Sequence, residues 1–296
     1  MGIYSNNIKP ILQRKDILIR LIVINVCIFL ILAIANIAKL FEINITDIIL
    51  NYIAVPAQLD ILLARLWTPL TYMFVHENFL HILFNMLMLY WFGQIFLSYF
   101  NPKNLGSLYI LGGLAGALLY VLSFNAIPLL IKMNYVPMIG ASASVMAIIF
   151  AVAFYRPNQE ITLFIFGRVK IIYIALILFV LDFIGLGSLS NPGGHIAHIG
   201  GALMGYIYAK QFLKGKDMTK WLNKTIDWIV NLFKPSLSKP KKMKVKYKNR
   251  EADYEFNKRK RNEAEDIDRI LDKIKASGYS SLNAEEKKRL FDASNK

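Results

Sequence analysis

The sequence predicts an all-α fold: a polytopic membrane protein with a bundle of spanning helices and a basic C-terminal tail. Of the 296 residues, 55% are hydrophobic, and they occur in long runs. A soluble domain this apolar would struggle to cover its surface. Charge is also segregated, because residues 1–209 hold 11 Lys/Arg and 7 Asp/Glu, whereas residues 210–296 hold 24 and 13. A membrane body followed by a polar tail is therefore expected.

Six apolar runs within residues 17–213 have the length and composition of membrane-spanning helices. The expected spans are 17–38, 79–100, 105–124, 138–155, 169–187 and 195–213. The first run is too long for a signal-peptide core, so we expect it to be retained. The single Cys27 lies inside it and has no partner for a disulfide, which makes it a structural membrane residue.

The basic residues near the short connections predict the orientation. Six spans place both termini on one side, and that side collects eight Lys/Arg, against three on the other. By the positive-inside rule the richer side is cytoplasmic. We therefore expect a multi-pass protein of the cell membrane with cytoplasmic N- and C-termini, beginning with a cytoplasmic segment at 1–16.

The segment 214–235 predicts an amphipathic helix, since Trp221, Ile226 and Ile229 recur at helical spacing beside lysines. Such a helix would lie on the anionic cytoplasmic leaflet of the lipid bilayer. A helix packed on the membrane domain is the alternative interpretation.

The rest of the tail predicts a basic linker at 236–262 and a small helical hairpin at 263–296. Gly278 would end the first helix of the hairpin, and Asn283 with Glu286 would form a capping box for the second. Because the basic tail adjoins a bilayer, we expect it to contact the membrane surface and not nucleic acid.

Polar side chains at membrane depth are costly and point to function. Such side chains, with the glycines beside them, form three groups that together contain all four histidines: His76, His81 and Asn85; Gly140 and Ser142; His195, His198, Gly201 and Gly205. At about 1.5 Å per helical residue, Ser142, His198 and Asn85 lie about 21, 18 and 24 Å from the cytoplasmic helix ends. Three helices thus bring polar groups to one level.

These groups have the chemistry of nucleophilic catalysis. Ser142 is expected at a helix N-terminus, where backbone N–H groups stabilise an oxyanion. His198 shares a helical face with Gly201 and Gly205, which let another helix approach closely. His81 and Asn85 form an i,i+4 pair of hydrogen-bond donors.

Alternative interpretations exist for several of these residues. Ser144 is expected to bond its own backbone, as serines in membrane helices usually do. It lies about 200° round the helix from Ser142, so the two serines cannot both face His198. The four histidines could in principle bind zinc, but no HExxH pattern or cysteine cluster is present, so we expect no metal and no cofactor. Intramembrane Asp182 is interpreted as a structural hydrogen-bond partner.

The runs RLWTPLTYMFVHENFLHILFNMLMLYWFG, GASASVMA and AHIGGALMG resemble the rhomboid family of intramembrane serine proteases. The resemblance covers about residues 14–213 and implies a six-span rhomboid-like bundle. It implies that Ser142 is the nucleophile and His198 the general base of a dyad. It further implies that His81 and Asn85 complete the oxyanion hole with the Ser142 N–H.

The resemblance also implies supporting residues. Trp67 matches the tryptophan of a first-loop W-R motif, His76 a histidine near the active site, and Gly201 and Gly205 the glycines that bring two spans together. Three departures stand out: Ala143 replaces a second glycine, Thr68 follows Trp67, and Met146 lies where many members have an aromatic ring. Met146 can still pack on the imidazole of His198.

The implied activity is hydrolysis of peptide bonds in the transmembrane segments of substrate proteins. A non-catalytic rhomboid-like protein that binds membrane clients is the alternative, although such proteins usually lack the serine or the histidine. A transporter is a third possibility, weakened because Asp182 is the one acid inside the predicted spans.

Overall fold

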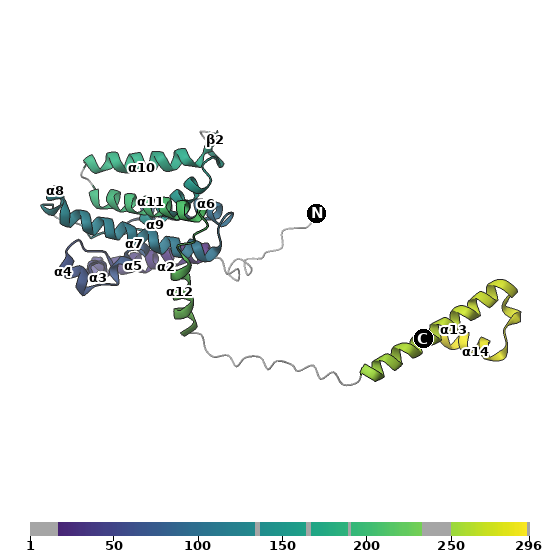
Figure 1. Ribbon diagram of the computed structural model, residues 1–296. Coiled ribbons are helices and arrows are strands. Elements are labelled where there is room, and N and C mark those ends of the chain that lie inside the picture. Colours follow the sequence, from purple (N-terminus) through teal and green to yellow (C-terminus); the bar gives the residue numbers. More distant parts are fainter. Residues whose placement is uncertain (1–16, 134–136, 164–166, 189–190, 233–249, 295–296) are drawn as a thin grey trace. The chain divides into compact units, whose positions relative to one another are not determined.

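The computed structural model describes residues 17–133, 137–163, 167–188, 191–232 and 250–294 (Figure 1). The chain divides into two compact units, Met1–Phe233 and Lys234–Lys296, and each is described by itself. The predicted N-terminal segment 1–16 and the predicted linker up to residue 249 lie outside the described residues.

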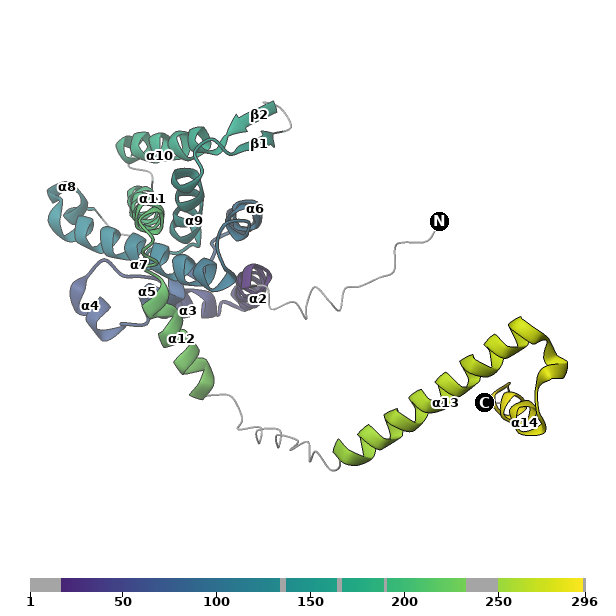
Figure 2. The ribbon, with the colours of Figure 1, turned by 45° about the vertical axis from the view of Figure 1, so that its right-hand side comes forward.

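In the described residues of the first unit, six helices of at least 14 residues form a bundle, and Figures 1 and 2 show its arrangement. They are α2 (Ile17–Ile37), α6 (Phe79–Leu97), α7 (Pro102–Ala126), α9 (Ser142–Tyr155), α10 (Ile171–Ser188) and α11 (Pro192–Leu213). Each falls on one of the predicted apolar runs. The fourth begins at Ser142 and not at residue 138, because the preceding segment is extended and pairs with the first loop.

The bundle has the character of a polytopic membrane protein. By length and composition, α2, α6 and α7 can each cross a membrane, and α9 and α10 are shorter apolar helices. Large apolar side chains also lie exposed on the outside of these helices, among them Ile34, Phe84 and Phe183. In water this surface would be unfavourable, whereas in lipid it is the expected exterior.

Helix α9 lies at the centre of the bundle, where it packs against α6, α7, α10 and α11 (Figure 2). Its residues from Ala143 to Ala153 are all buried. Close approach depends on small residues on both neighbours. A Cβ on Gly112 of α7 would overlap Ala147, and one on Gly201 of α11 would overlap the Ala143 carbonyl. The short helix α9 is thereby fixed in depth and rotation.

The connection between α2 and α6 is built of short helices. These are η1 (Ala38–Phe41), α3 (Ile45–Ile53), α4 (Leu59–Ala64), α5 (Thr68–Thr71) and η2 (Tyr72–Phe74), and α8 (Pro128–Ile131) follows α7. An antiparallel hairpin of β1 (Glu160–Leu163) and β2 (Gly167–Lys170) joins α9 to α10. This hairpin departs from the predicted all-α fold, but each strand has only four residues.

Helix α12 (Lys220–Leu232) contacts the start of α7 through polar side chains. Ser107 Oγ donates to Asn223 Oδ1 at 2.6 Å, and Lys103 forms an ion pair with Asp227. Trp221 and Trp228 on α12 remain exposed. The helix crosses the direction of α7, α10 and α11 (Figure 1). The alternative interpretation, a helix packed on the membrane domain, is therefore confirmed for the polar side of α12. Its position on the membrane surface stays a prediction.

The second unit contains α13 (Arg250–Ser277), η3 (Tyr279–Ser281) and α14 (Ala284–Ser294). The predicted basic linker was too long, because α13 begins at Arg250 and occupies the part assigned to residues 250–262. Gly278 follows the end of α13 with a φ of 78°, as predicted. The capping box is confirmed: the Glu286 N–H donates to Asn283 Oδ1, and the Asn283 N–H donates to Glu286 Oε2, both at 2.8 Å.

Candidate active site

Ser142 is the first residue of α9, and the segment before it is held in place by the first loop. Val55 and Met138 exchange two backbone hydrogen bonds of 3.0 Å, and the Gly140 N–H donates to the Tyr72 carbonyl at 3.0 Å. Gly140 has a φ of 126°, which an L side chain rarely adopts. A Cβ there would also lie 3.0 Å from His81 Nε2. Gly140 therefore allows the chain to turn into α9 beside His81.

His81 lies in the first turn of α6, where its backbone N–H donates to the N-cap Asn78. Its Nδ1 accepts a weak hydrogen bond of 3.5 Å from the Glu77 N–H. In a neutral ring this contact places the proton on Nε2, which is the nitrogen next to Gly140. His81 is thus arranged as a donor at the level of Ser142.

Asn85 is buried one turn further along α6, as the i,i+4 spacing predicts. Its Nδ2 donates to the His81 carbonyl at 2.8 Å, so one amide hydrogen is used within the helix. The second hydrogen, or a rotation of the side chain, remains for an oxyanion. The oxyanion role of Asn85 stays a prediction.

His198 lies on α11, three residues before Gly201, whose Cα faces the Ala143 carbonyl of α9. Among the hydrogen bonds of the described residues, none joins Ser142 Oγ to His198. Ala143 fits where a second glycine was expected because Gly116 of α7 leaves room: a Cβ on Gly116 would lie 2.6 Å from that of Ala143. The close approach of α9 and α11 at this level is as predicted.

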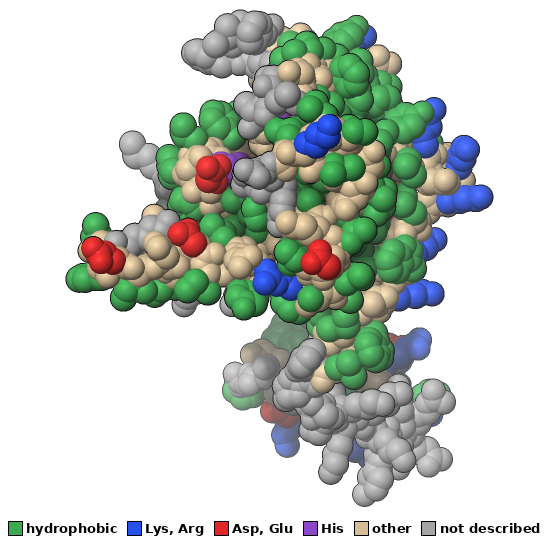
Figure 3. All heavy atoms as spheres, turned by 90° about the vertical axis from the view of Figure 1, so that its left-hand side faces the viewer, with side chains coloured by type: hydrophobic (Ala, Val, Ile, Leu, Met, Phe, Trp, Pro, Cys, Tyr) green, Lys and Arg blue, Asp and Glu red, His purple; other side chains and the backbone are tan. Residues whose placement is uncertain are grey.

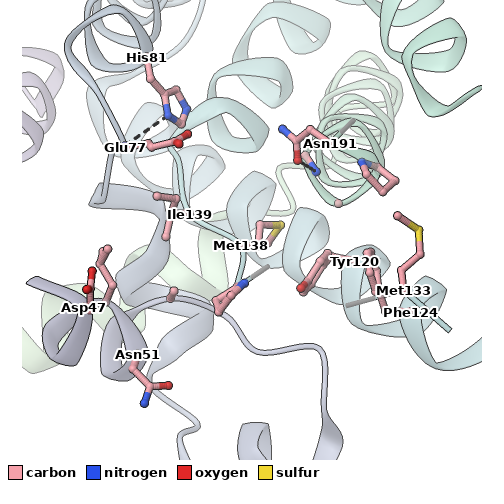
Figure 4. A pocket seen from close by; sticks show the side chains of 16 residues that line it. Asp47, Asn51, Glu77, His81, Tyr120, Phe124, Met133, Met138, Ile139 and Asn191 are labelled. Atoms are coloured by element: carbon pink, nitrogen blue, oxygen red, sulfur yellow. Dashed lines mark hydrogen bonds between the residues drawn. The ribbon is translucent and has the colours of Figure 1, made fainter. Parts of the chain in front are cut away.

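A cavity of about 770 Å³ adjoins His81. Its other lining residues include Asp47, Tyr120, Met138 and Asn191, and Ser142 and His198 are not among them. Figure 4 shows His81 and Glu77 on one side of the space and Asn191 across from them. The face at the α4 and α8 end carries acidic side chains among hydrophobic ones, with a histidine visible beside one acid (Figure 3). Of the candidate site residues, the cavity therefore reaches His81.

Asp182 of α10 contacts the proposed base directly. Its Oδ1 lies 2.8 Å from His198 Nδ1 and 2.9 Å from His195 Nδ1. The sequence interpretation of Asp182 as a structural hydrogen-bond partner did not identify these two histidines. The sequence did offer a signal. An acid inside the membrane needs a hydrogen-bond partner, and His195 and His198, three residues apart on the next span, were candidates.

Three supporting residues lie in different places. His76 is buried, with its ring centroid 5.1 Å from that of His81. Met146 is buried on α9, and its packing on His198 stays a prediction. Trp67 is 48% exposed, and its Nε1–H donates to the Tyr52 carbonyl at 2.8 Å. This hydrogen bond joins two parts of the first loop.

Ser144 differs from the prediction for it. It is fully buried against α7, 2.9 Å from the position of a Cβ on Gly113, and its hydroxyl has no hydrogen-bond partner among the described residues. The expected bond to its own backbone is therefore wrong. Its burial distinguishes it from the half-buried Ser142.

The ligand-type atoms of Asp182, His195 and His198 lie within 4.8 Å of one another, the one such group found among the described residues. The separations of 2.8 and 2.9 Å are those of direct hydrogen bonds, which already use the two Nδ1 atoms and Oδ1. We therefore interpret the group as a hydrogen-bonded cluster.

Fold and site together define a polytopic helical membrane protein with a serine and histidines gathered around a central short helix. A family profile described as "Rhomboid domain" matches residues 63–215, which is more than half of the chain. The chain belongs to the rhomboid family, as its motifs predicted. A second profile, "Family of unknown function (DUF6576)", matches residues 250–296, the hairpin unit.

Two curated relatives are similar at low identity. "RHOMBOID-like protein 12, mitochondrial" of Arabidopsis thaliana is 28% identical over 166 residues, which cover 51% of this chain and 48% of that protein. "Rhomboid protein 1, mitochondrial" of Saccharomyces cerevisiae is 29% identical over 139 residues, covering 46% and 38%. The chain thus spans less than half the length of these relatives.

Proposed function

We propose that this protein is an intramembrane serine endopeptidase that cleaves transmembrane segments of membrane proteins. The observation that carries the proposal is the position of Ser142. It begins a buried helix, Gly140 brings it beside His81 Nε2, and the adjacent Ala143 contacts α11 at Gly201, one turn from His198. Family membership supports the same activity.

In the proposed mechanism His198 Nε2 takes the Ser142 hydroxyl proton as Oγ attacks the scissile carbonyl. The oxyanion accepts hydrogen bonds from the Ser142 N–H, His81 Nε2–H and Asn85. His198 then donates its proton to the leaving amine, and an acyl-enzyme remains on Ser142. A water molecule gives a proton to His198 and attacks the ester, which releases the carboxylic acid and restores the serine.

A non-catalytic client-binding protein is the second candidate. The observation in its favour is that the described residues contain no hydrogen bond between Ser142 and His198. Catalytic hydrogen bonds often tighten only when substrate binds, so this geometry is also compatible with an enzyme. Because Ser142, His198 and His81 all occur on facing helices, we favour the peptidase.

The test is cleavage of a panel of tagged single-span membrane proteins by the purified full-length chain. We expect Ser142→Ala and His198→Ala each to lower kcat/KM by on the order of 10³-fold or more. Ser144→Ala is the matched control and should keep activity within about threefold, because its hydroxyl is buried and unpaired. EDTA should have no effect.

Two outcomes would contradict the proposal. If Ser144→Ala abolishes cleavage while Ser142→Ala retains it, the nucleophile assignment is wrong. If the wild type cleaves nothing, yet the wild type and Ser142→Ala co-purify with the same membrane proteins, the client-binding function replaces the peptidase.

We also propose that the protein is a multi-pass protein of the cell membrane with both termini cytoplasmic, and that the tail lies on the anionic leaflet. The distribution of Lys/Arg supports this orientation. Asn223 and Asp227 hold the polar side of α12 to α7, while Trp221 and Trp228 are exposed. Exposed tryptophans at the end of a bundle suit the lipid interface.

A further inference from the structure

The contact between α10 and α11 has a consequence for the proposed base. Asp182 Oδ1 is within hydrogen-bond distance of His198 Nδ1 and of His195 Nδ1. An ionised carboxylate can only accept hydrogen bonds, so each Nδ1 must carry a hydrogen. In a neutral His198 ring, Nε2 is then left without a proton, which is the form a general base requires.

The surroundings of Asp182 favour hydrogen bonds from both histidines. The Asp182 side chain is 11% exposed, and the two histidine side chains are 24% and 25% exposed. Gly185, one turn along α10, makes room for the His195 ring: a Cβ there would lie 2.5 Å from His195 Cε1 and Nε2. The two histidines therefore approach one oxygen from the same face of α10, and an intramembrane carboxylate obtains two donors.

Resting on the peptidase function proposed above, we infer that Asp182 is a positioning residue for catalysis. It fixes the tautomer and the ring orientation of His198, and it stabilises the imidazolium that forms when His198 accepts the Ser142 proton. His195 Nδ1 donates to the same oxygen. The charged and titratable groups near His198 are then Asp182 on α10, His195 on α11 and His81 on α6.

A merely structural role is the competing explanation, since Asp182 also connects two helices. The two roles predict different kinetics. Loss of a helix–helix contact lowers thermal stability and weakens substrate binding, whereas loss of the orienting carboxylate lowers kcat with little change in KM.

The test compares Asp182→Asn and Asp182→Glu with the wild type in the full-length protein. The readouts are kcat and KM for a transmembrane substrate, the rate of Ser142 labelling by a fluorophosphonate, and the apparent Tm in detergent. We expect Asp182→Asn to lower kcat and labelling by on the order of 10²- to 10⁴-fold, with KM changed less than about threefold. Asp182→Glu keeps the charge and should recover at least about tenfold over Asn.

Asn25→Ala is the matched control. Asn25 is also a buried polar residue of a spanning helix, where it bonds the Leu21 carbonyl and the Tyr109 hydroxyl far from His198. Its removal should lower the Tm and leave kcat within about threefold. If Asp182→Asn does not fold, Asp182→Ser provides an uncharged variant with a smaller side chain.

Retention of kcat and of labelling in folded Asp182→Asn or Asp182→Ser would overturn the positioning role while leaving the peptidase function intact. If the wild type shows neither cleavage nor labelling of Ser142, the proposed function fails, and the role of Asp182 fails with it.

Discussion

At the residue scale, the polar side chains of the candidate site come from separate parts of the chain and differ in their hydrogen-bond partners. His81 and Asp182 have hydrogen-bond partners. His76 is different, because both of its ring nitrogens are buried and neither makes a hydrogen bond of normal geometry within the described residues. A buried polar ring without partners is costly when charged, which gives His76 a measurable signature.

Burial lowers the pKa of His76 from 6.5 to about 4, the His81 ring lowers it further, and the Phe74 backbone acts in the opposite direction. Below about pH 6.5, His76 binds a proton in the unfolded chain, whereas in the folded protein it stays neutral until the pH approaches 4. The folded state is therefore penalised increasingly as the pH falls, up to about 3 kcal/mol near pH 4, and the penalty is absent above about pH 6.5.

We expect the apparent Tm of the wild type in detergent to fall more between pH 6.5 and pH 4 than that of His76→Leu, which has no such group. The apparent Tm of each protein is measured by tryptophan fluorescence on heating. Parallel pH profiles for the two proteins would show that His76 titrates normally and is not buried as described.

At the element scale, the position of α9 depends on the glycines of its neighbours. Gly201→Ala would place a Cβ on the Ala143 carbonyl, so α9 and α11 must separate at the level of Ser142. We expect a loss of about 1–3 kcal/mol in stability and at least about 10²-fold lower cleavage. Cleavage assays and thermal unfolding in detergent check both.

Gly187→Ala on α10 is the matched control, since nothing lies within 4 Å of the added Cβ. It should leave cleavage unchanged and be neutral or slightly stabilising, because alanine favours a helix over glycine. Equal effects of the two substitutions would contradict the role assigned to the contact at Gly201.

The same scale shows what could be predicted from the sequence. The six runs and the capping box at Asn283 depend on local patterns, and the structure has a helix on each run and the capping box. Three of these helices, α2, α6 and α7, are long and apolar enough to cross a membrane. The β1–β2 hairpin and the early start of α13 could not be predicted in this way. Each strand is only four residues long, and the first turns of α13 are rich in charge that we interpreted as linker.

The candidate site was predictable to the extent that residue type and depth identify it. Ser142, His198 and His81 stood out as polar groups inside apolar runs. The hydrogen bonds of Asp182 were not predictable, because they depend on the rotation of α10 against α11. The unpaired hydroxyl of Ser144 likewise depends on which face of α9 meets Gly113.

At the scale of the whole molecule, the charge distribution predicts that the hairpin unit stays in the cytoplasm. We expect a single cysteine introduced as Lys258→Cys, in a Cys27→Ala background, to be modified by an impermeant thiol reagent only after the membrane of intact cells is opened. The exposed Asp60 in α4, changed to Cys, is the control for the opposite side and should react in intact cells. The reverse pattern would contradict the orientation.

The tail is expected to add membrane contact and not catalysis. Deletion of 234–296, a separate compact unit, should leave cleavage in detergent within about threefold. The same deletion should weaken the salt-sensitive association of the cytoplasmic side with anionic vesicles. Loss of cleavage in this deletion variant would show that the tail is needed for catalysis.

The proposed nucleophile is tested most directly by identifying the serine that reacts with an active-site reagent. Full-length protein is treated with a fluorophosphonate, digested, and the modified peptide is fragmented in a mass spectrometer, which separates Ser142 from Ser144. We expect a single adduct on Ser142 that is lost in Ser142→Ala, forms much more slowly in His198→Ala and is retained in Ser144→Ala. An adduct on Ser144, or equal labelling of His198→Ala, would contradict it.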